Sequence, residues 1–228
     1  MLLLSLLGAA WSLRLLPQEG QLKLLKPSPR VLVEVLKIGR LRRLYLTVFC
    51  LFLVFAGMMN FLPFRLSELN RNASEMGTGL LYTGYLCGIL TALGSGKAVA
   101  LFGSDLRTIR VGLASFLLVL VGFVFSGETG LYLLMFVLCA AMFLVHATCS
   151  ALLNRLGGEH KGVVNGLYVA FYYAGGMVGS FLPGLIYRQW GWTAFVLALG
   201  MVLLASQVLL LRVREESFEP AGSTAVGP

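Results

Sequence analysis

The chain has 228 residues, of which 58% are hydrophobic and only 12% charged, with a formal net charge of +8. Soluble domains carry about a quarter charged residues, so this composition excludes a soluble globular enzyme, a disordered chain and a disulfide scaffold. It predicts a membrane protein that crosses the bilayer several times, with the lipid as its main partner. The four cysteines lie in apolar runs without metal-ligand spacing, so we expect no metal site and no cofactor.

The first apolar run, residues 1–13, is too short to cross about 30 Å of hydrocarbon. We interpret it as the remnant of a preceding transmembrane helix. A signal peptide and an interfacial segment around Trp11 are the alternatives. Residues 14–43 are rich in Lys and Arg and contain Pro27 and Pro29, which predicts a basic linker. Within it, residues 31–38 favour either a surface helix or a solvated tether.

Six charge-free runs are each close to the length that a membrane-spanning helix needs. They cover residues 44–64, 76–96, 111–127, 129–154, 162–187 and 189–211. None alternates as a barrel strand would, so we expect helices. The sequence therefore predicts an all-α membrane protein, with a six-helix bundle over residues 44–212 and a disordered tail over residues 213–228.

The positive charges divide unequally between the two ends of this bundle. Fifteen of the eighteen Lys and Arg residues fall in the linker, in the loops near 97–110 and 155–161, and in the tail. The other end holds only Arg65, Arg71 and Arg188. By the positive-inside rule, the linker and the C-terminus are expected in the cytoplasm. The basic charge is thus explained by topology, and no nucleic-acid partner is predicted.

Ionisable side chains are scarce inside the expected spans. None of the ten acidic residues lies in the middle of a run, and His146 is the strongly polar ionisable group within one. A buried His is costly unless it is paired, so His146 is a candidate for the substrate pathway. The alternative is a neutral His that merely bonds a neighbouring helix.

Further pathway candidates are Asn60, Tyr85, Tyr172 and Tyr173. Tyr combines an aromatic wall with a hydroxyl, which suits a pocket of mixed polarity, although packing alone also explains such residues. Glycine recurs at helical spacing, and small residues at this spacing allow close helix packing and favour bundles that rock. The residues expected in packing and gating are Gly84, Gly88, Gly175, Gly176, Gly179 and Pro183.

Three stretches resemble the C-terminal half of a major facilitator superfamily transporter. They are residues 55–66 (FAGMMNFLPFRL), residues 79–85 (GLLYTGY) running on to Gly96, and residues 166–192 with their glycines, tyrosines and Gly-Trp ending. The narrower resemblance is to bacterial drug, sugar-efflux and arabinose-type exporters of the inner membrane. In the cytoplasmic loop motif of that family, Gly96 and Gly103 match the two glycines, with Arg107 as a nearby charge. Ala100 stands where the family has Asp, which puts a charge relay in this loop in doubt.

The resemblance implies that the six spans are helices seven to twelve of a twelve-helix transporter. It also implies proton-coupled efflux of a small organic solute by alternating access, with the substrate path between two halves. The partner is then a missing N-terminal half or a second copy of the chain.

Two other interpretations stay open at this stage. The chain is a truncated, inactive or partner-dependent membrane fragment with no transport of its own, or it is a membrane-embedded enzyme. An enzyme is disfavoured, because no paired carboxylates and no His cluster lie in a span.

Overall fold

The structure is a computed structural model that describes Trp11, residues 29–72 and residues 74–211. Apart from Trp11, the expected helix remnant in residues 1–13 lies outside these residues. So do the linker before residue 29 and the C-terminal tail.

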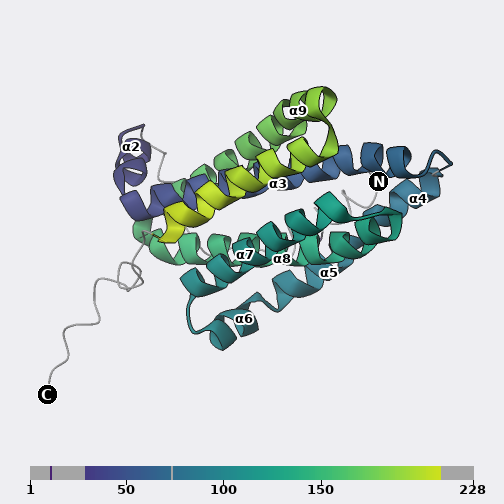
Figure 1. The fold of residues 1–228 in the computed structure, drawn as a ribbon. Coiled ribbons are helices and arrows are strands. Elements are labelled where there is room, and N and C mark those ends of the chain that lie inside the picture. The colour runs from purple at the N-terminus through teal and green to yellow at the C-terminus, as the bar shows by residue number, and fades with distance from the viewer. Residues whose placement is uncertain (1–10, 12–28, 73, 212–228) are drawn as a thin grey trace, which may run out of the picture.

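All the regular elements of the described residues are helical, which confirms the all-α prediction (Figure 1). In chain order they are α2 (Pro29–Lys37), α3 (Gly39–Leu69), α4 (Glu75–Leu81), α5 (Gly84–Leu93), α6 (Ser95–Phe102), α7 (Asp105–Phe125), α8 (Glu128–Leu156), the short 3-10 helix η1 (Gly158–His160) and α9 (Lys161–Leu211).

The longest helix, α9, is a hairpin of two arms that meet at Gly191, where φ is 75° and ψ is −175°. The first arm runs in the same direction as α3, because the Val164 carbonyl accepts from Tyr45 and Ser180 accepts from Asn60 farther along α3. The second arm returns: Trp192 at its start lies beneath Arg65 near the end of α3 and bonds Phe123 at the end of α7, whereas the carbonyl of Leu210 accepts from Arg110 near the start of α7. The first arm, residues 161–190, and the second arm, residues 192–211, therefore cross the molecule separately, as Figure 1 shows.

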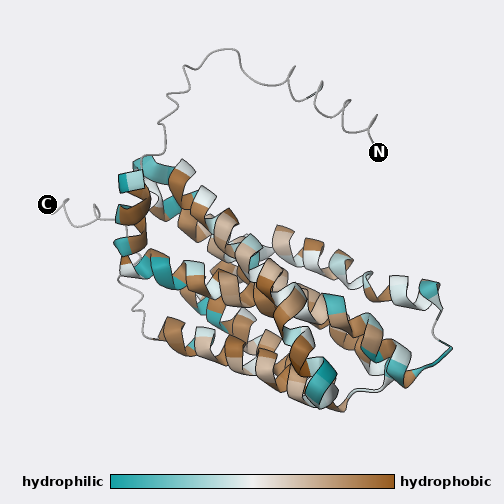
Figure 2. Cartoon of the chain, turned by 90° about the horizontal axis from the view of Figure 1, so that it is seen from above, coloured by the Kyte–Doolittle hydropathy of each residue, from teal (hydrophilic) through white to brown (hydrophobic). Residues whose placement is uncertain are grey.

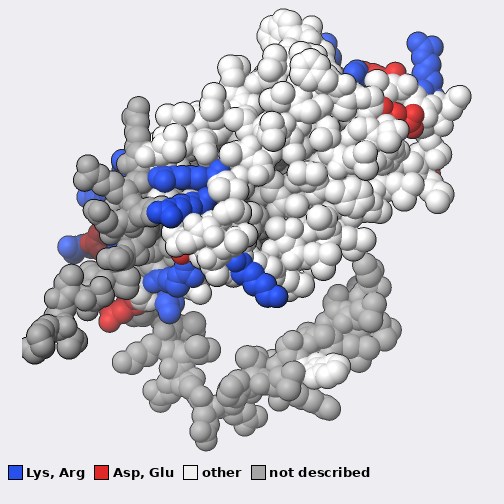
Figure 3. Space-filling view, turned by 60° about the horizontal axis from the view of Figure 1, so that its bottom comes forward, with Lys and Arg blue, Asp and Glu red and all other residues white. Residues whose placement is uncertain are grey.

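Five helical segments of the described chain are long and apolar enough to cross a membrane, and the last of them is the α9 hairpin. Counting its two arms gives six crossings, as the sequence predicts. Figure 2 shows hydrophobic residues along the helices and hydrophilic residues mostly toward their ends. In Figure 3, Lys and Arg gather mainly at one end of the molecule, with an uncharged surface between the ends.

Two spans start earlier than their apolar runs. The first begins at Gly39 and so includes residues 39–43 of the expected linker, and the third begins at Asp105. In α7 the Ser104 hydroxyl caps the helix by accepting from the backbone N–H of Arg107. Lys and Arg are tolerated at such ends because their long side chains reach the interface. An apolar run therefore marks the lipid-buried part of a helix but not its length.

The second span is interrupted, which its apolar run does not reveal. A turn at Tyr82 and Thr83 separates α4 from α5, and the backbone N–H groups of these residues bond carbonyls only three positions back. The Thr83 hydroxyl also donates to the Leu80 carbonyl at 2.7 Å, the same oxygen that accepts from the Thr83 backbone N–H. After α5, the chain forms the short helix α6 where an open loop is expected.

The bundle is organised around α3, which packs mainly against α9, while α8 packs against α5 and α7. The largest fully buried side chains include Tyr45, Phe116, Phe123 and Phe195. Lipid is as apolar as these side chains, so close packing rather than removal from water holds such helices together.

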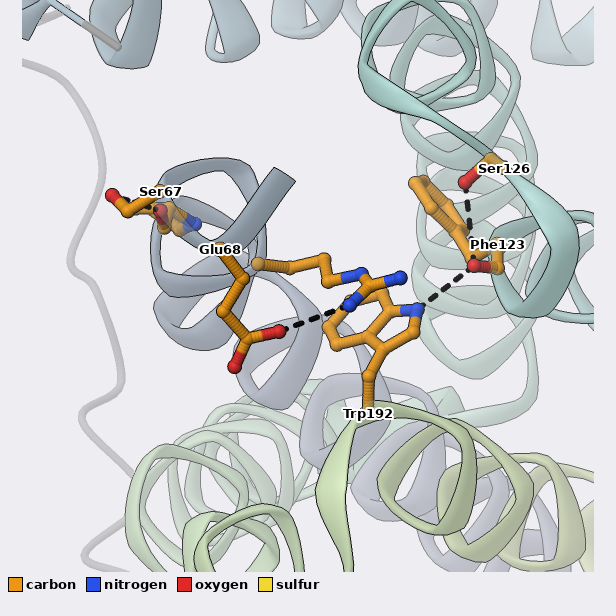
Figure 4. Close-up of polar contacts among 7 residues, drawn as sticks. Ser67, Glu68, Phe123, Ser126 and Trp192 are labelled. Atoms are coloured by element: carbon orange, nitrogen blue, oxygen red, sulfur yellow. Dashed lines mark hydrogen bonds and ion pairs between the residues drawn. The ribbon is translucent and has the colours of Figure 1, made fainter. Parts of the chain in front are cut away.

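A polar cluster secures the turn between the two arms of α9 (Figure 4). The indole N–H of Trp192 donates to the Phe123 carbonyl at 2.8 Å and so ties the second arm to α7. The Arg65 guanidinium of α3 lies over the Trp192 ring, 5.8 Å from its centroid, and pairs with Glu68 at 3.0 Å. Three elements therefore meet at this end of the molecule.

Candidate functional site

The imidazole of His146 is held by a side chain from the neighbouring helix. Its Nδ1 lies 2.5 Å from the hydroxyl of Tyr168 in the first arm of α9, and the same hydroxyl donates to the His146 carbonyl at 3.1 Å. Tyr168 is buried, at 5% exposure. Among the described residues, Nε2 has no hydrogen-bond partner, so this nitrogen remains for a ligand or water.

Aromatic rings from three helices enclose this pair. The His146 ring centroid lies 5.1 Å from Phe52 of α3, 6.5 Å from Phe143 of α8 and 6.0 Å from Tyr172 of α9. Tyr172 also contacts Phe52 at 4.7 Å. Ring separations of 4.5–7 Å are those of favourable aromatic pairs. The enclosure therefore fixes both the position and the tilt of the imidazole.

A groove of about 520 Å³ opens beside His146, between α8 and the first arm of α9. Its lining residues are His146, Ala147, Ser150, Ala151, Asn154, Asn165, Tyr168, Val169 and Tyr172. Three of the polar ones, His146, Ser150 and Asn154, follow each other at four-residue spacing on α8 and so share one helix face. The groove is of mixed polarity, and none of the residues that line it carries a fixed charge.

Two asparagines meet in this groove. The side-chain amide of Asn165 donates to the side-chain oxygen of Asn154 at 3.2 Å. Each amide has both donor and acceptor groups, so one bond between them leaves one NH₂ and one carbonyl oxygen with spare capacity. This holds whichever way round the two amides are placed.

The polar residues continue along α9 toward the other end of the molecule. Asn60 of α3 donates to the Ser180 hydroxyl at 2.9 Å, and Ser180 donates to the Gly176 carbonyl at 2.8 Å. Ser180 follows Tyr172 and Gly176 at four-residue spacing, so all three share one face of the arm. We call the whole set the polar stripe, and its members are Asn60, His146, Ser150, Asn154, Asn165, Tyr168, Tyr172 and Ser180.

The sequence-predicted pathway residues occupy three kinds of place. His146 and Tyr172 line the groove, and Asn60 lies farther along the polar stripe. Tyr173 is 65% exposed, and its ring lies tilted against that of Tyr172 with ring centroids 4.3 Å apart. Tyr85 does not line the groove. It contacts Phe55 and Phe143, each at 5.8 Å, and so reaches His146 only through the ring of Phe143.

Sequence reasoning missed Ser150, Asn154, Asn165 and Ser180 as site residues. Asn154 lies at the end of an apolar run and Asn165 near the start of the next. Polar residues are common at such positions, so they do not indicate a site. The available signal was the four-residue spacing of polar side chains from His146 to Asn154.

The glycines that the sequence marks differ in their surroundings. A Cβ on Gly175 or Gly179 would collide with the backbone of α3, at the carbonyls of Phe49 and Leu53 respectively. A Cβ on Gly84 would lie 2.9 Å from the Met135 carbonyl oxygen, and one on Gly88 would lie 2.6 Å from the Phe143 ring. Gly176 has open space, and Pro183 is buried inside α9.

The residues of the expected loop motif lie on a helical connection. Gly96 is inside α6, Gly103 ends that helix with φ at +82°, and Arg107 is in the first turn of α7. Asp105 pairs with Arg155 of α8 at 2.6 Å. This ion pair fastens the start of α7 to the end of α8.

No group of three or more His, Cys, Asp or Glu side chains that could hold a metal ion occurs in the described part of the chain. The arrangement can bind an uncharged polar molecule through hydrogen bonds and ring contacts.

Six apolar crossings with a polar stripe on one face define a helical, multi-pass membrane protein. Residues 44–227 match the Major Facilitator Superfamily, so the chain belongs to this superfamily of secondary transporters, which are generally not enzymes. The match confirms the family that the sequence resembles. No curated protein matched the chain.

Proposed function

We propose that the chain provides the substrate-binding part of a proton-coupled exporter of small organic solutes in the cytoplasmic membrane, and that it works by alternating access. The polar stripe is the observation that carries this proposal. It extends from Asn154 and Asn165 at the basic end of the bundle to Asn60 and Ser180 nearer the other end. A transporter needs a chain of polar contacts of this kind through the membrane.

The opposite side of the bundle supports the assignment of faces. A second groove, between α7 and the second arm of α9, is lined by Leu117, Leu120, Val121, Val124, Val196, Leu197, Gly200, Met201 and Leu204. These apolar side chains suit lipid chains. Unpaired polar groups are costly in hydrocarbon, so the polar stripe belongs against water or another protein surface.

The helix packing supports a movement of the first arm of α9 against the remaining helices. Gly175 and Gly179 give this arm a close, smooth contact with α3, while Pro183 weakens its hydrogen-bond ladder. The turn at Tyr82 and Thr83 gives the second span a similar weak point. Broken helices around a polar site are typical of transporters that alternate between two openings.

We propose that His146 is the residue of the polar stripe that takes up and releases the coupled proton. The stripe includes no Asp or Glu, and Nε2 of His146 is available at the groove. The outward direction and the identity of the coupling ion rest on the resemblance to bacterial exporters. The orientation rests on the basic end, which we place in the cytoplasm.

We further propose that the exposed polar face is covered by six more helices of the same transporter or by a second copy of the chain. Tyr173 lies midway along the first arm and is 65% exposed, and Asn60 and Ser180 are exposed beside it. Such residues are stable at membrane depth only beside water or protein.

The test is transport by the purified full chain in proteoliposomes. A mixture of uncharged, cationic and anionic organic solutes is added, a proton gradient is imposed, and the accumulated compounds are identified by mass spectrometry. We expect gradient-driven accumulation of at least one solute, abolished by a protonophore, and exchange of that solute in the absence of a gradient.

The His146→Gln variant separates coupling from movement. It should lose gradient-driven accumulation but keep exchange, because glutamine can still form hydrogen bonds but cannot take up a proton. Absence of both activities in the wild-type chain would refute transport by the chain alone or as a dimer, and unaltered accumulation by the variant would refute the role of His146.

A further inference from the structure

The groove between α8 and the first arm of α9 is lined by apolar side chains and by polar side chains without a fixed charge. Arg155, the cation next to the groove in sequence, is paired with Asp105 of α7. A charged solute in a partly buried site needs a counter-charge to offset its lost hydration. The lining offers only imidazole, hydroxyl and amide groups, and these suit an uncharged solute.

The asparagine pair further restricts the chemical class of solute that the groove can bind. Asn154 and Asn165 bond one another and leave one spare amide NH₂ and one spare carbonyl oxygen within the same groove. A solute group with a donor beside an acceptor, as in a carboxamide, satisfies both at once. A lone acceptor or a lone donor satisfies only one of the two groups.

The side chains that line the groove favour a solute with a flat aromatic ring. Tyr172 and His146 present aromatic surface, and the small side chains of Ala147 and Ala151 also line the groove. The volume of about 520 Å³ lies in the usual range for small-molecule sites, about 300–1,000 Å³. An aromatic ring carrying one polar substituent fits such a groove.

We propose that this groove binds uncharged aromatic solutes that carry a neighbouring hydrogen-bond donor and acceptor, of which an aromatic carboxamide is the simplest. Asn154 and Asn165 bind the polar group, and His146 and Tyr172 contact the ring. The proposal rests on the proposed transport function for its biological role, but binding itself is measured without transport.

Three probes of the same size distinguish the charge states: 4-nitrobenzamide, which is neutral, 4-nitrobenzoate, an anion, and 4-nitrobenzylammonium, a cation. Binding to the full chain in lipid nanodiscs is measured by equilibrium dialysis. We expect the amide to bind at least ten-fold more tightly than either ion. Equal or tighter binding of an ion, or no binding of the amide, would overturn the proposal.

Two independent variants locate the site. Asn165→Leu removes half of the asparagine pair, and Ala151→Trp fills the groove without removing a hydrogen bond. Each should weaken amide binding at least ten-fold. The control is Asn72→Leu, an exposed asparagine at the opposite end of the molecule, which should bind as the wild type does. Wild-type affinity in both groove variants would contradict the assignment.

The two proposals fail in different ways. If the proteoliposomes move solutes but the neutral probe does not bind at the groove, the transport function stands and the groove assignment is wrong. If the amide binds at the groove but no solute is moved, the binding site stands and transport by the chain alone or as a dimer is wrong.

Discussion

At the scale of single residues, the contact between Tyr168 and His146 orients the one imidazole of the polar stripe. Phenylalanine at position 168 would keep the buried ring but remove the hydroxyl that meets both Nδ1 and the carbonyl of His146. Losing such a bond and leaving a buried partner unsatisfied costs about 1–3 kcal/mol. We therefore expect Tyr168→Phe to lower the thermal unfolding temperature and to weaken solute binding, and both are measured in nanodiscs.

Tyr82→Phe is the matched control for that experiment. The Tyr82 hydroxyl is partly exposed and lies 3.5 Å from the Met59 carbonyl, too far for a bond of much strength. It should unfold at the wild-type temperature. If the two variants unfold at the same temperature, the Tyr168 hydroxyl does not hold His146.

Only part of this site can be predicted from the sequence. His146 is conspicuous because an ionisable residue is rare in an apolar run. Its partner Tyr168 lies on another helix, and only the packing of α8 against α9 decides which of several tyrosines reaches Nδ1. Helix packing also decides the position of Tyr85. The sequence favours it as a pathway residue as much as Tyr172, but it contacts phenylalanines and does not line the groove.

At the scale of elements, the contact between α3 and the first arm of α9 depends on glycine. A Cβ on Gly179 would overlap the Leu53 carbonyl, and backbone cannot move aside as a flexible side chain can. Overpacking of this kind costs about 1–3 kcal/mol or more. We expect Gly179→Ala to lower the unfolding temperature measured in detergent.

Gly176→Ala is a close control on the same arm, because a Cβ there meets nothing within 4 Å. Alanine favours a helix over glycine by up to about 1 kcal/mol, so this variant should be as stable as the wild type or more stable. Equal destabilisation by both substitutions would show that the contact with α3 does not control the effect.

The turn between the arms of α9 gives a separate prediction. Gly191 has φ at 75° and ψ at −175°, a conformation essentially restricted to glycine, while a Cβ there would meet open space. Gly191→Ala should therefore destabilise the protein through the backbone alone, by about 1–3 kcal/mol. Thermal unfolding measures the loss, and an unchanged transition would contradict the glycine-specific geometry.

Most of the elements follow from the sequence because lipid imposes a length on each apolar run. The runs give the six crossings, but not the turn at Tyr82 and Thr83 or the helix α6. The turn and the helix α6 depend on local hydrogen bonds and on neighbouring helices, and hydropathy contains no information about either. The apolar runs also fail to predict the charged first turns of α3 and α7, because helices extend past the hydrocarbon.

At the scale of the whole molecule, the two sides of the bundle differ in what they can face. The polar stripe follows α3, α8 and the first arm of α9, and the apolar groove lies between α7 and the second arm. A bundle with one polar and one apolar side is expected to expose only the apolar side to lipid.

Tyr173 and Met201 form a matched pair that tests this difference. Tyr173 is 65% exposed and Met201 is 66% exposed, and each lies near the middle of its arm of α9. In a background with the four native cysteines replaced by alanine, we expect Tyr173→Cys in native membranes to react with a membrane-impermeant maleimide and Met201→Cys to remain unmodified.

A thiol reacts as its thiolate, which is favoured in water and suppressed in hydrocarbon. Two positions that are equally exposed in the isolated chain should therefore be labelled unequally in the membrane. After solubilisation in denaturing detergent both positions should react fully, which shows that each cysteine is present. Equal labelling in the membrane, or labelling of position 201 alone, would mean that the face of α9 next to the polar stripe does not line a water-filled path.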